Sequence, residues 1–253
     1  MTAVGIGLAV AACIFLGGLL GMLAHRFLPA AHLKSDTQDV VRLGTGMLSV
    51  LASLVLGLMV ATAKTSFDTT DSEIRSYGAD LILLAETFRD YGDAAAAPRD
   101  LLRSYTEALL HDDWPDSGKR PFTDENRAAA DLLEHVREAI RALTPVDDGQ
   151  RWLQTQALQV NTSLLRQRWL LVEQAEPSVR PVFLVVLVTW ITLIFFSFGL
   201  NAPRNATVVV AFTVCALAFG GAIFLILQLD SPFAGLMRVS SRPIVTALAH
   251  MQP

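Results

Sequence analysis

The sequence predicts an all-α integral membrane protein, with four transmembrane helices and a helical-bundle insert between the second and third spans. Three observations predict this class. Four stretches of the chain contain no Asp, Glu, Lys or Arg, and each has about the 20 residues that cross a bilayer core. Only 17% of all residues are charged, against about 25% in soluble domains. A polar region with apolar residues at helical spacing separates the second pair of stretches from the first. The uncharged stretches are residues 3–24, 43–63, 182–203 and 205–229.

The uncharged stretches form two hairpins, at residues 1–63 and 182–229. Almost no chain separates the third stretch from the fourth, which favours a tight turn at residues 201–205. No cation precedes the first stretch, and it is longer than the apolar core of a signal peptide, so we expect it to remain as a membrane helix. Cys13 and Cys215 both lie within uncharged stretches, so they indicate neither a disulfide framework nor a metal cluster.

The insert, residues 64–181, begins with a helix that continues the second span. Apolar residues there alternate in steps of three and four, as in a coiled-coil seam. No proline or glycine interrupts the chain between the second span and this seam before Gly78, so one long helix is expected. The seam comprises Ile74, Tyr77, Leu81, Leu84, Phe88 and Tyr91.

Three further helices complete the predicted bundle. Pro98 opens the first of them, because proline is favoured in a first helical turn. Thr123 is the expected N-cap of the next, and the last runs from about Trp152 to Glu173. Antiparallel helices joined by short loops are typical of a bundle.

The C-terminal region, residues 230–253, is predicted to be an interfacial elbow followed by a short helix. Asp230 or Ser231 is an expected N-cap with Pro232 in the first turn, and a second serine–proline pair precedes Ile244. The expected elbow motif comprises Asp230, Pro232, Phe233 and Gly235.

Charge sets the expected orientation and excludes one class of partner. The insert carries 14 Lys and Arg against 21 Asp and Glu, and such an acidic surface argues against nucleic acid. Lys and Arg near the span ends number seven on the side of the insert and four on the other. Because cations accumulate on the cytoplasmic side, we expect the insert and both termini to be cytoplasmic.

Known catalytic motifs are missing from the sequence, so no enzyme, cofactor or metal site is predicted. His25 and His32 share a loop with Asp36 and Asp39, but their spacing is not that of metal ligands. The spans also lack the intramembrane charges that coupled transporters use. A passive pore is compatible with uncharged spans.

The second span carries a band of small and hydroxyl side chains at four-residue spacing. Such a band favours close helix packing, and it is also compatible with a weakly polar pore lining. Lys64 at its inner end would attract anions, or extend its amine to lipid headgroups. The candidate pore-lining residues are Thr45, Ser49, Ser53, Gly57, Ala61, Lys64 and Thr65.

Two segments resemble the bacterial DUF4239, or bestrophin-like, membrane protein family. Residues 54–115, beginning LVLGLMVATAKTSFDTTDSEIRSYG, resemble the family's span exit and first bundle helices. LQLDSPFAGLMRV, residues 227–239, resembles its motif after the last span. At the position where an acidic Leu-Asp-Arg-like patch is expected, this chain has Leu84, Ala85 and Glu86.

The resemblance implies a bacterial inner-membrane protein and a homo-oligomer. Through the remoter likeness to bestrophins, which are pentameric anion channels lined by their second span, it implies a passive, anion-leaning ion channel. The alternative is a membrane scaffold or regulatory subunit whose bundle docks a partner. The lipid bilayer and small ions are the other expected partners.

Overall fold

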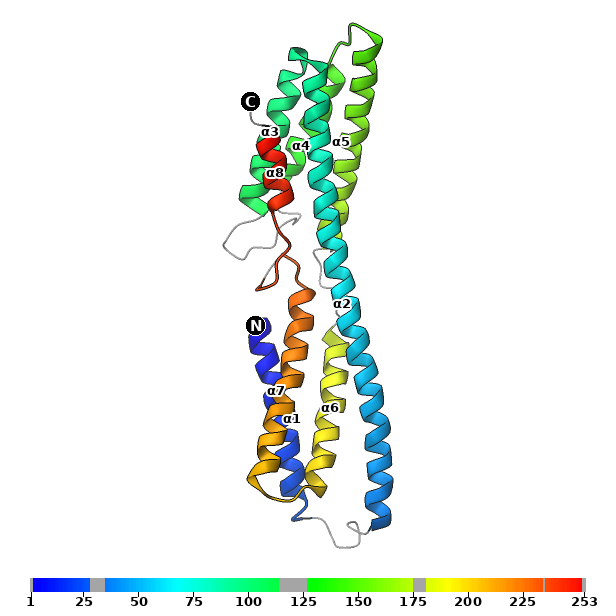
Figure 1. Cartoon of the computed structure of the whole chain (residues 1–253), viewed down its shortest axis with the longest axis vertical. Helices are drawn as coiled ribbons and strands as arrows, with labels where there is room; N and C mark the ends of the chain where they lie inside the picture. The colour runs from blue at the N-terminus through cyan, green and yellow to red at the C-terminus, as the bar shows by residue number, and fades with distance from the viewer. Residues whose placement is uncertain (1, 28–34, 114–126, 175–180, 234, 252–253) are drawn as a thin grey trace. The chain divides into compact units, whose positions relative to one another are not determined.

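The computed structural model describes residues 2–27, 35–113, 127–174, 181–233 and 235–251. Within these ranges the chain forms eight α-helices, one 3₁₀ turn and no strand, which confirms the all-α class (Figure 1). Four of the helices are long and apolar enough to cross a membrane. The α-helices are α1 (Ala3–Ala24), α2 (Ser35–Tyr91), α3 (Ala96–Asp113), α4 (Arg127–Ala142), α5 (Asp148–Gln174), α6 (Pro181–Asn201), α7 (Ala206–Leu229) and α8 (Arg242–His250), with the 3₁₀ turn η2 at Asp93–Ala95.

The chain divides into two compact units. The first comprises Met1–Ser66 and Ser178–Asp230, and therefore holds the spans; the second comprises Phe67–Pro177 and Ser231–Pro253. The 57-residue helix α2 contributes to both, as the uninterrupted seam predicted. The division of the sequence into four ranges, at 63, 181 and 229, remains a prediction.

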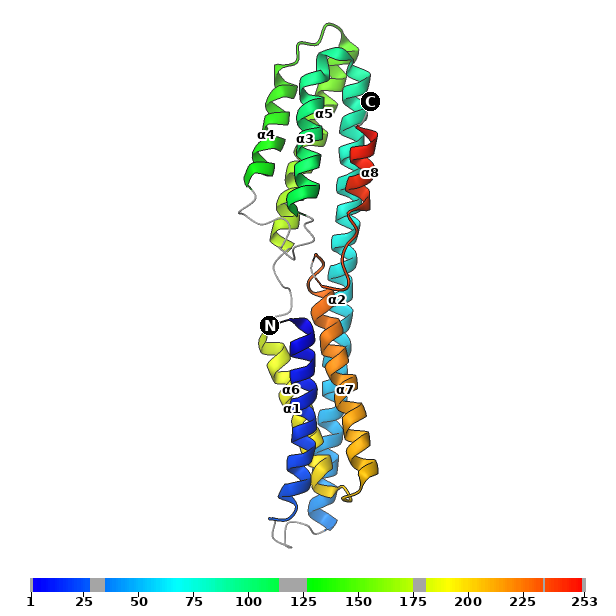
Figure 2. The same ribbon diagram turned by 90° about the vertical axis from the view of Figure 1, so that its left-hand side faces the viewer.

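In the first unit, α1 packs against α6 and α7, which lie beside it in Figures 1 and 2. Glycines allow the close approach, since small residues let membrane helices touch along their backbones. A Cβ atom on Gly7 would lie 2.9 Å from the carbonyl oxygen of Gly220, and one on Gly17 would lie 2.6 Å from the Thr192 side chain.

Two polar contacts fix the end of α1 to the turn between α6 and α7. Arg204 donates from Nη2 to the carbonyl oxygen of Met22 at 3.1 Å. Nδ1 of His25 lies 2.8 Å from the carbonyl oxygen of Leu200. Because they satisfy carbonyls near the ends of α1 and α6, they stabilise this end of the unit.

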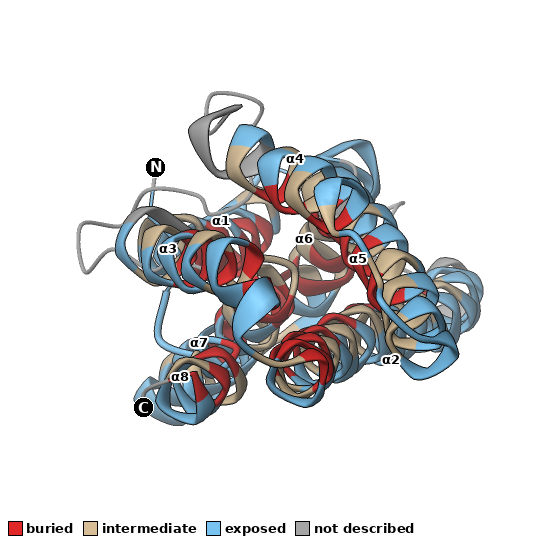
Figure 3. Cartoon of the chain, turned by 90° about the horizontal axis from the view of Figure 1, so that it is seen from above, coloured by how far each residue is buried: buried red, intermediate tan, exposed pale blue. Residues whose placement is uncertain are grey.

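In the second unit, α3, α4, α5 and the C-terminal part of α2 bury their apolar sides against one another. Buried residues, red in Figure 3, lie on the sides of these helices that face each other. The six seam residues from Ile74 to Tyr91 are at most 3% exposed, so the coiled-coil-like spacing correctly predicted the buried face of α2. The hydroxyls of Tyr77 and Tyr105 form a buried hydrogen bond within this core.

The C-terminal helix α8 packs on this bundle. Ile244 and Ala247 are fully buried, and Pro243 lies so close to Gly78 on α2 that a Cβ there would be 2.7 Å from the proline Cβ. Ser241 is the N-cap residue of α8 and Pro243 lies in its first turn. The serine–proline signal therefore correctly predicted where this helix begins.

One predicted helix start differs from the structure, and another lies outside the described residues. Helix α5 begins at Asp148 and not near Trp152, because Asp147 Oδ1 accepts a hydrogen bond from the Gln150 amide at 2.6 Å and caps the helix earlier. Thr123, the predicted N-cap of the preceding helix, lies outside the described residues.

Candidate functional site

The membrane portion of α2 is the least buried of the four spans. Of the 18 consecutive apolar residues that represent each span, 11% are buried in α2, against 33% in α1, 28% in α6 and 22% in α7. Ala52 and Ala63 are its buried apolar positions. They fall on one side of the helix, and most of the rest of its circumference is exposed in the described chain.

The N-terminal end of the candidate band takes part in helix packing. The hydroxyl of Thr45 lies 2.9 Å from that of Ser197 on α6. Ser49 donates to the carbonyl oxygen of Thr45 at 2.8 Å. Both positions are half-buried. The Thr45 hydroxyl serves the helix packing that the sequence also allowed, whereas the Ser49 hydrogen bond lies within α2.

The rest of the candidate band lies on the exposed side of α2. Four residues turn an α-helix by about 400°, so four-residue spacing drifts about 40° at each step. The band therefore winds away from α6 and leaves the packed face after Ser49. The exposed members are Ser53, Gly57, Ala61, Lys64 and Thr65.

A straighter stripe runs along the exposed side. Gly46 and Lys64 are 18 residues apart, or about five full turns and about 27 Å, and therefore point in the same direction. Ser53 and Gly57 lie between them on nearly the same line. A Cβ atom added at Gly46 or Gly57 would meet nothing within 4 Å.

Gly46 does not belong to the band at four-residue spacing, but it lies on the same line as Lys64 at 3.6 residues per turn. Towards the start of the helix, the missing side chain at Gly46 leaves a shallow hollow on the surface of α2. It is lined by Asp39, Arg42, Leu43, Met47 and Val50.

The motif after the last span forms a turn. The predicted N-cap role of Asp230 is wrong: Asp230 is the C-cap of α7, and its amide donates to the carbonyl oxygen of Ile226 at 2.9 Å. No helix follows in the described part of residues 231–241. The reason lies in the backbone, because Gly235 has φ of +93°, outside the helical region.

Two hydrogen bonds hold this turn. The Val239 amide donates to the carbonyl oxygen of Pro232 at 2.8 Å, and Arg238 Nε donates to the carbonyl oxygen of Gly235 at 2.8 Å. Pro232 is buried, and Phe233 packs against the core of the second unit. The motif residues of the sequence therefore have a structural role in joining α7 to α8.

Among the described residues, no three His, Cys, Asp or Glu side chains gather closely enough to hold a metal ion. His32 and Asp36 belong to segments whose side chains are not described.

Comparison with known proteins agrees with this architecture. The sequence model of the Bestrophin-like domain matches residues 12–244. The chain belongs to the Bestrophin-like family. It is accordingly a membrane protein, and the family match includes all of α2 and most of α1. A search of curated proteins gave no match.

Solved structures of a bacterial bestrophin homologue from Klebsiella pneumoniae share the fold of this Bestrophin-like chain. One point variant aligns with a TM-score of 0.70 at 13% identity, covering 99% of this chain and 97% of that one. Another aligns with a TM-score of 0.68 at 12% identity over 96% and 97% of the two chains. A structure phased with zinc gives 0.67 at 12% identity over 96% of each.

Proposed function

We propose that this Bestrophin-like protein is a passive ion channel formed by several copies of the chain around a central pore. The observation that carries the proposal is the exposed side of α2. A span with so little packing inside its own chain is available to contact other copies. Small side chains along one line of that span would leave a gap at the axis of a ring.

The two exposed sectors of α2 support separate roles. The stripe of Gly46, Ser53, Gly57 and Lys64 has small side chains and a cation at one end. Next to it around the helix lies a sector of bulky exposed side chains. We assign the small stripe to the pore and the bulky sector to contacts with neighbouring copies or lipid. The bulky residues are Leu43, Met47, Leu51, Leu54 and Leu58.

The permeant ion is proposed to be an anion. Within residues 43–63, the stripe crosses the membrane without any charge, so it attracts neither sign along that length. Lys64 is the first ionisable residue after it, and a ring of lysines at a pore mouth would concentrate anions.

The protein is proposed to lie in a bacterial inner membrane, with the bundle and both termini in the cytoplasm. The distribution of Lys and Arg near the span ends supports this orientation.

The proposal is tested by two measurements on the purified full chain. Averaged particle images should show a ring with a central axis, and vesicles containing the protein should release chloride down its gradient. Particles that are monomers or dimers, together with vesicles that pass no ion at any tested pH, would favour the scaffold role instead.

A further inference from the structure

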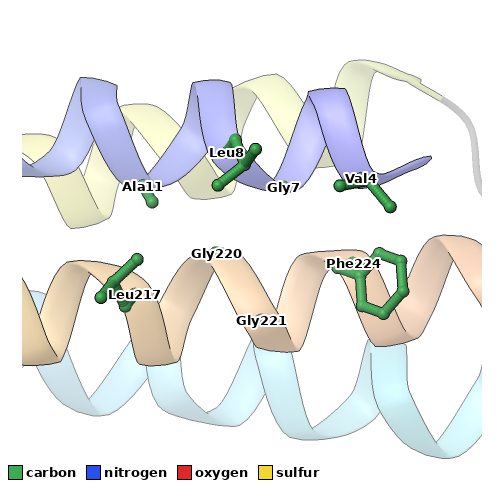
Figure 4. A pocket seen from close by; sticks show the side chains of 8 residues that line it. All are labelled: Val4, Gly7, Leu8, Ala11, Leu217, Gly220, Gly221 and Phe224. Atoms are coloured by element: carbon green, nitrogen blue, oxygen red, sulfur yellow. The ribbon is translucent and has the colours of Figure 1, made fainter. Parts of the chain in front are cut away.

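An apolar groove runs along the contact between α1 and α7. Figure 4 shows it between the two helices, with three glycines that lack side chains and larger side chains at its rims. Its volume is about 210 Å³. Gly7, Gly220 and Gly221 form the gap, and Leu8, Leu217 and Phe224 flank it.

The groove is held open by a backbone contact. A Cβ on Gly220 would lie 2.6 Å from the carbonyl oxygen of Gly7, so the helices are already as close as two backbones allow. They cannot move together to fill the gap, because interiors are packed at contact distance. At Gly221, by contrast, an added Cβ would meet nothing within 4 Å.

The position of the groove defines the medium around it. Both α1 and α7 are membrane spans. The groove begins at Val4, next to the start of α1, and at Phe224, five residues before the end of α7. It reaches Ala11 and Leu217, a length of about 10 Å at 1.5 Å per residue. One leaflet of hydrocarbon is about 15 Å thick, so the groove opens into a single leaflet.

The dimensions and the lining of the groove limit which molecules can bind in it. Three glycines without side chains form the gap, so it is no deeper than one side chain, whereas an α-helix is about 10 Å across. A helix of a second copy cannot enter. Its lining side chains are all hydrocarbon, which disfavours a polar ligand. A narrow, flexible methylene chain meets both conditions.

We infer that this groove binds one acyl chain of a phospholipid from the leaflet in which α1 begins and α7 ends. Packing of the methylenes against the fixed walls gives the bound chain dispersion contacts that it lacks among mobile lipid tails. The site does not depend on ion conduction, since it uses neither the exposed side of α2 nor Lys64.

The test uses the full protein in vesicles made with a phospholipid that carries a photoreactive diazirine midway along one acyl chain. After illumination, mass spectrometry locates the adducts. Leu8 (60% exposed) and Leu217 (55%) have matched controls on the same helices, Leu20 (56%) and Val214 (60%). The bound chain should give more adducts at Leu8 and Leu217 than at these equally exposed controls.

Filling the groove should abolish the difference. Gly221→Leu places a side chain in the gap without a backbone clash, so the excess labelling at Leu8 and Leu217 should be lost while labelling of Leu20 and Val214 is unchanged. Gly44→Leu is the matched control, because its Cβ also meets nothing within 4 Å and it lies on α2. Thermal melting and size-exclusion profiles verify that both variants fold.

Three results would overturn the inference. Equal labelling of Leu8 and Leu20 in the wild-type protein would mean that lipid contacts the groove no more than the open surface. Retained excess labelling in folded Gly221→Leu would place the chain elsewhere. Adducts that join Leu8 to a second copy of the protein would show that a neighbouring side chain fills the groove.

Discussion

The hydroxyls of Thr45 on α2 and Ser197 on α6 lie 2.9 Å apart, in the membrane unit of the chain. This pair ties the first turns of the α2 span to a helix that is more than 150 residues distant in sequence. It lies at the packed end of the band of small residues on α2, which becomes exposed after Ser49.

The first prediction concerns this pair. Thr45→Val should lower the free energy of unfolding by about 0.6 kcal/mol, the average for a hydrogen bond between membrane helices. Ser197→Ala should have a similar effect. Because each change removes the same bond, the double variant should cost clearly less than the sum. Thermal unfolding of the purified variants measures this, and strict additivity would show that the hydroxyls act independently.

The second prediction tests the pore assignment. Ser53→Trp should block ion flux in vesicles, because its indole would occupy the axis of the ring. Leu54→Trp is the control: it is the next residue along the helix, is exposed and belongs to the bulky sector. Both variants should assemble. Block by Leu54→Trp with normal flux through Ser53→Trp would mean that the bulky sector faces the pore.

The third prediction concerns Lys64. Lys64→Glu should shift the permeability ratio of chloride to sodium towards sodium, and Lys64→Gln should give an intermediate ratio. At about 8 Å in water a unit charge contributes roughly 0.5 kcal/mol, so each step should change the ratio about twofold or more. The shift should shrink at high salt, where exposed charges are screened. Reversal potentials in vesicles measure the ratio, and identical ratios in all three proteins would remove Lys64 from the pore mouth.

The fourth prediction concerns orientation. In a variant in which Cys13 and Cys215 are replaced, a cysteine at Ser35 should react with an impermeant thiol reagent on intact cells. A cysteine at Ala97 should react only after lysis. Ala97 is exposed on α3, whereas the neighbouring Ala95 is fully buried and would report poorly. The opposite pattern would place the bundle outside the cell without changing the number of spans.

The fifth prediction concerns the turn after α7. Gly235→Ala should destabilise the protein by about 1–2 kcal/mol, since a side chain at positive φ meets the neighbouring carbonyl. Gly44→Ala should be neutral or slightly stabilising, because Gly44 is helical and its Cβ would meet nothing within 4 Å. A comparison of melting temperatures decides this. Equal effects of the two changes would mean that the turn does not need glycine.

The positions of the helices could be predicted because their signals are local. Uncharged stretches correspond to the four spans, and the three-four spacing from Ile74 to Tyr91 correctly gave the buried face of α2. The prediction for the motif around Asp230 was wrong because the conformation there depends on residues further along the chain. Aspartate and proline are typical of a helix start, yet the Gly235 backbone and the bond from Val239 to Pro232 close the chain into a turn.

The candidate site could be predicted only as a set of residues. Sequence spacing placed Thr45 and Lys64 in one band, but it could not show that α6 covers one end and leaves the other exposed. Likewise, Gly7 and Gly220 are ordinary glycines in the sequence. Their facing contact, and the groove beside it, depend on how two distant helices pack.

The packing of α1 against α6 also has a consequence for biosynthesis. Gly17 contacts Thr192, which is synthesised 175 residues later. At about 5–20 residues per second, the partner of α1 emerges roughly 9 to 35 s after it. During that interval the ribosome has released the first two spans and most of the bundle. The glycine face of α1 must therefore wait in the lipid without its partners, and the membrane unit can assemble only when translation is nearly complete.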